Sequence, residues 1–509
     1  MGYMFKMEIL EADSNRLESI PSEIGKWTSL QQLDISNNHL TLLPESLGLC
    51  CSLRYLYTHS NSLTLLPSTI GGCFRLEYID ASRNKLRELP EDMGHLVSLK
   101  HLDLNCNRIG HMPRDLGNSS KLVYLDMSSN ILVFLPESFS KLRALEICNL
   151  DNNELIMQPD RFNQCVSLQI IRMRKNHSTN ISSDIGACRK LTKLDAASNR
   201  IEQVPLEIGL MTCLQELDLS YNRLTTVPAE LGSCGMLQRL VLSHNLIEGC
   251  FPVTIGLVGS LRSLEISFNK ISELPRSVIG LKLVETITAE RCMLSALPDT
   301  FIYLDALQTL DLSNNLFTRF PIELSAMKSL KLLSLANNSI ALLPRNINSM
   351  SKLESLSLKR NQLRALPVEF VQVFESVGAV ELDSNPWTDL PPRWGRLWEG
   401  KHAVEGPHGY ALTEAVDFLY GMQAFYDAAE DIWKELGVFH YSKRLGFADF
   451  LDELRKRIPK TWHDGLIDYV KHVYFSVRES ARLSFSLSFF LSLPLPPPKL
   501  RTPTLNLPP

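Results

Sequence analysis

Residues 206–228 read LEIGLMTCLQELDLSYNRLTTVP, and this stretch holds one complete copy of the pattern that decides the fold. Around Asn222 the spacing is L-x-x-L-x-L-x-x-N-x-L-x-x-x-P. An asparagine recurs at steps of 23 residues, at Asn15, Asn38, Asn61, Asn84, Asn107, Asn130, Asn153, Asn176, Asn199, Asn222 and Asn245. After one-residue slips this asparagine ladder continues through Asn269, Asn315, Asn338, Asn361 and Asn385, with Cys292 at the one vacant position. A repeat of this length predicts a solenoid in which each unit contacts only its neighbours.

The L-x-L core of each unit alternates between a buried and an exposed side, which predicts a strand with one buried face. Stacked strands of this kind form one curved parallel sheet. The ladder asparagine follows the strand, where its amide can both donate to and accept from turn backbone groups that water cannot reach. A short helical segment such as residues 91–96 then returns along the back. Glycines recur in these segments, and we expect them to end helical turns with positive φ. They are Gly25, Gly48, Gly71, Gly94, Gly117, Gly186, Gly209, Gly232 and Gly256.

The predicted architecture is therefore α/β, a solenoid of about seventeen repeats with a small all-α C-terminal region. At about 4.8 Å between strands the inner face would be about 80 Å long, which suits a macromolecule better than a metabolite. The solenoid is expected over residues 1–393, beginning inside a strand without a preceding cap. Apolar residues at helical spacing predict a helical cap or small helical domain over 394–480. Residues 481–509 are predicted to be a disordered low-complexity tail.

Composition narrows the class of protein. A net charge of −4 and a pI near 6.3 argue against a general nucleic-acid or membrane-surface binder. The 11 cysteines lack clustered pairs, and Cys51, Cys73, Cys165, Cys188, Cys213 and Cys234 are expected to be buried thiols behind the strands. This usage favours a reducing, cytoplasmic compartment. The apolar run 483–493 is too short for an integral membrane segment.

Catalytic motifs are not found in the sequence. It contains no G-x-x-x-x-G-K-[ST] phosphate loop and no kinase H-R-D motif. His440, His463 and His472 are too scattered to predict a metal site. We therefore expect neither enzyme activity nor a cofactor or metal.

The predicted inner face offers candidates for protein binding instead. Four residues before a ladder position, acids form a stripe that could steer a basic partner or merely support turns: Glu11, Asp34, Asp80, Asp103, Asp126, Asp195, Asp218, Glu265, Asp311 and Glu381. Large rings, typical anchors of interfaces, lie on consecutive strands at Tyr55, Tyr57, His59, Tyr78, His101 and Tyr124. Arg172, Arg174 and Lys175 form a basic island that could receive an acidic loop or phosphate, or simply pair with Asp195.

The repeat in residues 206–222, LEIGLMTCLQELDLSYN, resembles the intracellular Ras-group class of leucine-rich-repeat proteins, which includes the Ras–Raf scaffold of animals and its plant relatives. The resemblance covers about residues 8–391. It implies a non-catalytic scaffold in signal transduction that binds a small GTPase, a kinase or a phosphatase on its concave face. Two alternatives remain, a polarity or cell-cortex adaptor and an immune-type ligand sensor.

Overall fold

The structure is a computed structural model, and it describes residues 6–156, 164–370, 373 and 376–386. These residues form two compact units. The first comprises the described residues up to Met293 together with Pro298–Leu307, and the second comprises Leu294–Leu297 and the described residues from Gln308 on. The helical region predicted for 394–480 and the tail predicted for 481–509 lie outside the described residues, so both stay predictions.

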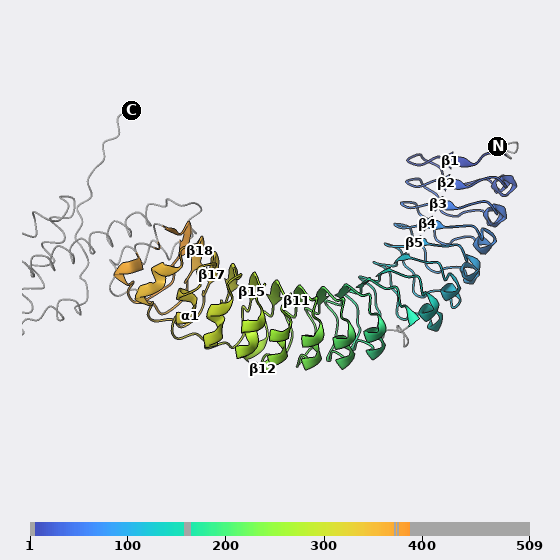
Figure 1. Ribbon diagram of the computed structural model, residues 1–509. Helices are drawn as coiled ribbons and strands as arrows, with labels where there is room; N and C mark the ends of the chain where they lie inside the picture. Colours follow the sequence, from blue (N-terminus) through green and yellow to red (C-terminus); the bar gives the residue numbers. More distant parts are fainter. Residues whose placement is uncertain (1–5, 157–163, 371–372, 374–375, 387–509) are drawn as a thin grey trace, which may run out of the picture. The chain divides into compact units, whose positions relative to one another are not determined.

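Short parallel strands, one per repeat, are the recurring element of both units, as the sequence predicts (Figure 1). In the first unit they are β1 (Ile9–Glu11), β2 (Gln32–Asp34), β3 (Tyr55–Tyr57), β4 (Tyr78–Asp80), β5 (His101–Asp103), β6 (Tyr124–Asp126), β7 (Ile147–Asn149), β8 (Ile170–Arg172), β9 (Lys193–Asp195), β10 (Glu216–Asp218), β11 (Arg239–Val241), β13 (Ser263–Glu265) and β15 (Thr286–Thr288). In the second unit they are β16 (Thr309–Asp311), β17 (Leu332–Ser334), β18 (Ser355–Ser357) and β19 (Ala379–Glu381). Neighbouring strands pair with equivalent residues opposite each other, for example Tyr78 with His101.

Short helical segments lie behind the strands, and in the first unit the strands line the concave side (Figure 1). The segments are mostly 3₁₀ turns: η1 (Ser22–Lys26), η2 (Glu45–Leu49), η3 (Ile70–Gly72), η4 (Glu91–His95), η5 (Leu116–Asn118), η6 (Glu137–Lys141), η8 (Ser183–Ala187), η9 (Leu206–Leu210), η10 (Ala229–Ser233), η11 (Val253–Leu257), η12 (Arg276–Gly280) and η13 (Asp299–Tyr303). The second unit contains α1 (Ile322–Ser325), η14 (Arg345–Ser349) and η15 (Val368–Phe370). Proline precedes most of them and fixes the backbone where the segment begins.

Apolar side chains fill the space between the strands and the helical segments. In the repeat of residues 206–228, Leu217, Leu219 and Leu224 are each at most 1% exposed. Full burial of a leucine side chain stabilises a fold by about 1.5–3 kcal/mol. Because every repeat supplies the same set, the core continues along the solenoid axis from one repeat to the next.

The ladder asparagines connect consecutive repeats by hydrogen bonds. Asn222 is representative: its Oδ1 accepts from the Ile201 N–H at 2.9 Å, and its Nδ2 lies 3.0 Å from the Ala196 carbonyl, both in the preceding repeat. The same Nδ2 lies 3.0 Å from the Leu219 carbonyl of its own turn. A residue with φ between 51° and 58° stands directly before every ladder position, so the turn reverses within one residue. The repeat pattern of leucine and asparagine did not predict this conformation.

The recurring glycines do not adopt the predicted positive φ; among the described glycines only Gly249 does, with φ of 75°. They are needed for close packing instead. A Cβ at Gly117 would lie 1.8 Å from the carbonyl oxygen of Ser138 in the next repeat. Gly249 lies between Asn245 and Asn269, where the asparagine spacing is 24 residues rather than 23. The pairing register shifts between Gly249 and Cys250, within an additional two-stranded sheet of β12 (Glu248–Cys250) and β14 (Lys270–Glu273).

Two of the cysteine predictions are wrong. Cys51 is exposed and Cys213 is half-exposed, whereas Cys73, Cys165, Cys188 and Cys234 are buried as expected. The buried position comes 12 residues after a ladder asparagine, and Cys50 occupies it in the second repeat, where its Sγ donates to the Ile24 carbonyl at 3.3 Å. Cys51 and Cys213 come one and two residues later, where the chain has turned toward solvent.

Candidate protein-binding surface

Four rings on the strand face of the first unit form a continuous aromatic ladder, namely Tyr57, Tyr78, His101 and Tyr124. The ring centroids of Tyr57 and Tyr78 are 5.0 Å apart, with the planes tilted by 41°. Tyr78 stacks on His101 and His101 stacks on Tyr124, each at 4.2 Å and within 6° of parallel. The stacking follows from the register, because β4, β5 and β6 place these three residues directly opposite one another.

Two of the predicted aromatic residues stay outside this ladder. Tyr55 is 36% exposed and lies opposite Tyr78 in the strand register, but it makes no ring contact with a described residue. The ring that contacts Tyr78 is that of Tyr57, which is half-buried and lies opposite Asp80 in the register, one diagonal step away. His59 follows β3, and its Nδ1 lies 3.3 Å from the Ser60 hydroxyl. Both residues therefore border the ladder on its first repeat.

A row of carboxylates, Asp80, Asp103 and Asp126, runs beside the aromatic ladder two residues further along β4, β5 and β6. Asp80 Oδ1 accepts from the Ser82 N–H at 3.0 Å, and Asp103 Oδ1 accepts from the Asn105 N–H at 3.0 Å. In both residues one carboxylate oxygen thus supports the turn of its own repeat. The second oxygen accepts no hydrogen bond from any described residue and stays available to a partner.

Burial and mutual repulsion set the charge state of this surface. Burial, with smaller contributions from neighbouring carboxylates, raises the pKa of Tyr78 and of Tyr124 to about 12. Burial lowers the pKa of His101, although the negative charges of Asp80 and Asp126 act to raise it. Burial, partly opposed by the hydrogen bond from Asn105, raises the pKa of Asp103 to about 6. At neutral pH the rings are therefore uncharged and the surface is negative.

The acidic stripe is not uniform along the strands. In the first unit Arg239 pairs with Glu265 at 2.8 Å, and in the second unit Lys359 pairs with Glu381 at 3.1 Å. Asp80, Asp103 and Asp126 form no ion pair with any residue in the described ranges. The carboxylates beside the aromatic ladder are thus not compensated by ion pairs, and neither are Asp34, Asp218 and Asp311, which also form none with a described residue.

The basic island of Arg172, Arg174 and Lys175 is partly neutralised. Arg174 Nε lies 3.6 Å from Asp195 Oδ1, and its backbone N–H donates to Asp151 Oδ1 at 2.6 Å. Arg172 is half-buried between the register positions of Asn149 and Asp195 and forms no ion pair within the described part of the chain. The pairing with Asp195 is the simpler alternative that the sequence left open, and it accounts for Arg174 but not for Arg172.

A second set of stacked rings, which the sequence pattern did not predict, lies at the position directly before the ladder asparagine. Tyr221, His244 and Phe268 occupy this position in consecutive repeats. Their centroids are 4.0 Å apart in each pair, and the planes lie within 12° of parallel. A scan of that position for rings at the repeat period would have found them.

Among the described residues, no three His, Cys, Asp or Glu side chains gather in a way that could hold a metal ion. The described helices are all too short or too polar to cross a bilayer.

Comparisons with known proteins agree with this geometry. One leucine-rich-repeat family model matches residues 97–155 and 189–247, and a second matches residues 29–50 and 306–327. No curated protein matches the chain. The repeated strand, asparagine and 3₁₀ segment together with these matches define the fold as a leucine-rich-repeat solenoid, a fold typical of protein-binding scaffolds.

Solved structures give the same result. A leucine-rich-repeat protein from Leptospira interrogans is 29% identical, with a TM-score of 0.57 over 69% of this chain and 90% of that one. The ectodomain of the Arabidopsis receptor kinase HAESA, solved with a peptide hormone, is 26% identical, with a TM-score of 0.61 over 76% of this chain and 67% of that one. YopM from Yersinia enterocolitica, 24% identical with a TM-score of 0.56 over 76% of each chain, shares the fold alone.

Proposed function

We propose that this chain is a non-catalytic scaffold that binds a partner protein on the strand face of its first unit. The observation that carries the proposal is the stacked aromatic ladder beside carboxylates that form no ion pair with a described residue, although both oxygens of Asp126 accept hydrogen bonds. Rings lose little side-chain entropy on binding, and here stacking has already fixed them. Two features of the partner follow, an apolar surface that covers the rings and cations that meet Asp80, Asp103 and Asp126.

The charge of the surface supports a basic partner. A negative patch speeds the encounter with a positive one, and this effect weakens as salt screens the charges. Association should therefore slow by at least about tenfold between low and high ionic strength, while the aromatic contacts persist. An association rate that is independent of salt would argue against a basic partner.

We further propose that the scaffold works in intracellular signalling, with a small GTPase, a kinase or a phosphatase as partner. The resemblance of the repeat to the Ras-group class supports this assignment. The 11 cysteines support it too, since all are free thiols and most are buried, as is usual in a reducing compartment.

A second candidate function is the recognition of an extended peptide by an immune-type or ligand-sensing receptor. The similarity to the HAESA ectodomain, which was solved with a peptide hormone, favours it. Arg172, a half-buried cation without an ion-pair partner among the described residues, would meet an acidic group of such a peptide. Arg172→Gln separates the candidates, because it should weaken capture of an acidic peptide and leave a basic partner bound.

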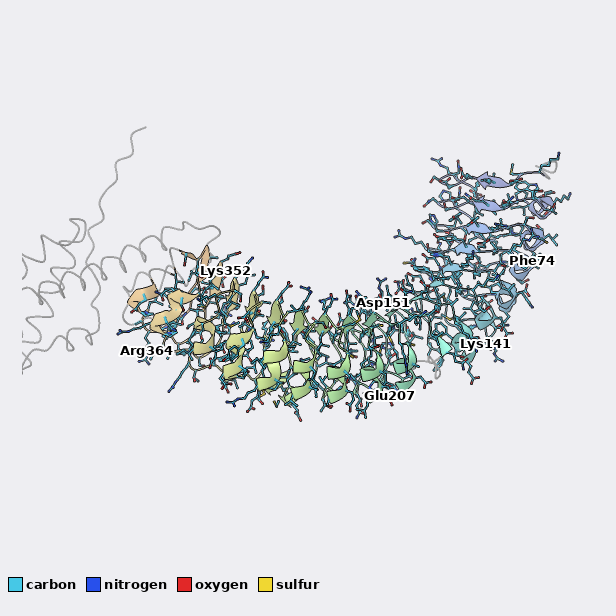
Figure 2. The ribbon with its side chains drawn as sticks, in the orientation of Figure 1. Phe74, Lys141, Asp151, Glu207, Lys352 and Arg364 are labelled. Atoms are coloured by element: carbon cyan, nitrogen blue, oxygen red, sulfur yellow. The ribbon has the colours of Figure 1, made fainter. Side chains whose placement is uncertain are left out.

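The decisive experiment is affinity purification from the native cell with the wild type and two variants. Tyr57→Ala with Tyr78→Ala removes one end of the aromatic ladder and should lower partner recovery by about tenfold or more. Phe74→Ala is the matched control, because Phe74 is 46% exposed and lies on the opposite side from the strand-side residue Asp151 (Figure 2). Equal recovery with all three proteins would reject the site.

Removing residues 395–509 tests whether the partner is held by the solenoid. A scaffold that binds through the strand face should keep its partners after this deletion. Loss of every partner would assign the function to the C-terminal region instead.

A further inference from the structure

The second column of rings lies on a different part of the first unit from the aromatic ladder. Tyr221, His244 and Phe268 stack in parallel, and the guanidinium carbon of Arg291 lies 5.3 Å from the Phe268 centroid. Arg291 thus covers one end of the column by a cation–π contact. At the other end Tyr221 is 55% exposed, and the preceding repeat has only the short side chain of Ser198 at this position.

The backbone makes this column unusual. All four residues have φ between 53° and 58°, a region in which bulky side chains are disfavoured by about 1–2 kcal/mol each. Most other repeats carry serine or asparagine here, as at Ser129. Three consecutive rings at this position therefore have no explanation in the requirements of the turn.

Exposed apolar and basic side chains lie close to the column in the sequence, and the acid Glu290 also acts on it, because its charge partly opposes the lowering of the His244 pKa by burial. Leu246 and Met293, each two residues after a member of the set, are 45% and 48% exposed. Arg200, Arg223 and Lys270 directly follow ladder asparagines and are exposed. These three cations form no ion pair or side-chain hydrogen bond with any residue that the structure describes.

We propose that Tyr221, His244, Phe268 and Arg291 form a second docking surface, whose occupant is an acidic segment of a partner protein with an aromatic or leucine side chain. That side chain would pack on the free face of Tyr221, above Ser198, where an aromatic ring would continue the stack. Carboxylates on either side would meet Arg200, Arg223 and Lys270. The inference rests on the proposed function only in treating the chain as a protein-binding scaffold, because the two surfaces differ in charge and share no residue.

A single-stranded nucleic acid also combines stacking with negative charge. Successive bases, however, need successive free ring faces. Here the rings use their faces on one another and Arg291 covers the far end, so only Tyr221 offers an open face. The geometry therefore favours a protein segment.

Selection of random displayed peptides on the full chain tests the proposal. A parallel selection uses Tyr221→Ser with Phe268→Ser, which should fold because serine stands at this position in other repeats. Tyr303→Ser is the matched control, since this ring is 49% exposed and has Lys282 at 6.0 Å, but belongs to η13. We expect the selected peptides to be rich in Asp or Glu and to contain an aromatic or leucine residue. Their affinity should fall at least about tenfold in Tyr221→Ser with Phe268→Ser, and also in Arg223→Gln with Lys270→Gln. The control should bind them as tightly as the wild type does.

Three outcomes would overturn the proposal: no acidic peptides, acidic peptides that bind the double variant as well as the wild type, or labelled oligouridylate that binds the wild type and loses affinity in the double variant. Tyr57→Ala with Tyr78→Ala distinguishes the two surfaces. If this variant loses only basic peptides while acidic peptides are absent, the proposed function stands and the second surface fails.

Discussion

The ladder asparagine is the residue on which the solenoid depends most. One side chain satisfies a backbone N–H and a carbonyl of the preceding repeat and two carbonyls of its own turn, all where water is excluded. Cys292 shows what a replacement retains. Its thiol donates to the Ile266 carbonyl at 3.4 Å, but sulfur is a poor acceptor for the N–H that asparagine would satisfy.

Asn222→Ala should therefore lower the free energy of unfolding by about 2–4 kcal/mol, because it leaves buried donors and acceptors unpaired. Asn222→Cys should lose less, since the thiol can still donate as Cys292 does. Urea unfolding followed by circular dichroism measures both. An alanine variant as stable as the wild type would show that the ladder bonds are dispensable.

Asp103 should make stability depend on pH. Its pKa of about 6 exceeds the ordinary 3.8 because of burial, so the folded chain holds the proton more tightly than the unfolded chain. Stability from this group is then present at low pH and falls as pH rises from about 4 to about 6. Asp103→Asn removes the titration and keeps an acceptor for Asn105.

The free energy of unfolding of the wild type should therefore fall relative to that of the variant between about pH 4 and about pH 8. The relative change should be on the order of 1–3 kcal/mol. Urea midpoints of both proteins at the two pH values provide the measurement. A difference between the proteins that does not change with pH would contradict the assignment.

At the scale of the element, glycine determines how closely the 3₁₀ segments of adjacent repeats approach. The Cβ position at Gly117 is occupied by the Ser138 carbonyl at 1.8 Å, whereas a Cβ at Gly110 would meet nothing within 4 Å. The two glycines are only seven residues apart and neither has a positive φ, so they form a matched pair.

Gly117→Ala should destabilise the protein by about 2 kcal/mol or more, because η5 must move away from η6. Gly110→Ala should change stability by less than about 0.5 kcal/mol. Thermal unfolding of the two variants decides the matter. Similar losses at both positions would mean that backbone entropy, rather than close approach, explains the recurring glycines.

The first unit carries the negative surface beside the aromatic ladder and the proposed second surface, to which we assign Arg200, Arg223 and Lys270. Four strand steps separate β6, which carries Tyr124, from β10, after which Tyr221 follows. At about 4.8 Å per step this is about 20 Å, enough for two peptide segments side by side. A scaffold of this kind would hold a basic and an acidic partner together.

We saturate the aromatic ladder with a basic peptide whose binding depends on Tyr78. The affinity for an acidic peptide whose binding depends on Tyr221 should then change by less than about twofold. Fluorescence anisotropy of the labelled acidic peptide, with and without the basic one, measures this. Competition between the two would show that they share one surface.

The repeat pattern predicted the strands, the helical segment after each proline and the buried leucines, because a period fixes which residues of successive units lie opposite one another. The residues of the candidate site were only partly predictable. Register alone places Tyr55 against Tyr78, yet the ring contact is made by Tyr57, which lies diagonally from Tyr78 and opposite Asp80. A rotamer of this kind depends on both neighbouring repeats.

The spacing of leucine and asparagine was enough to predict a solenoid of leucine-rich repeats, because it fixes which residues of each repeat are buried against the next. The tertiary structure decided what a one-dimensional pattern cannot carry. The structure shows that the glycines allow close packing and that Cys50, rather than Cys51, is buried. It also shows that Tyr221, His244 and Phe268 form one column. The physical reason is that these contacts join residues of different repeats, and their distances depend on how the repeats pack and turn rather than on the order of residues within one repeat.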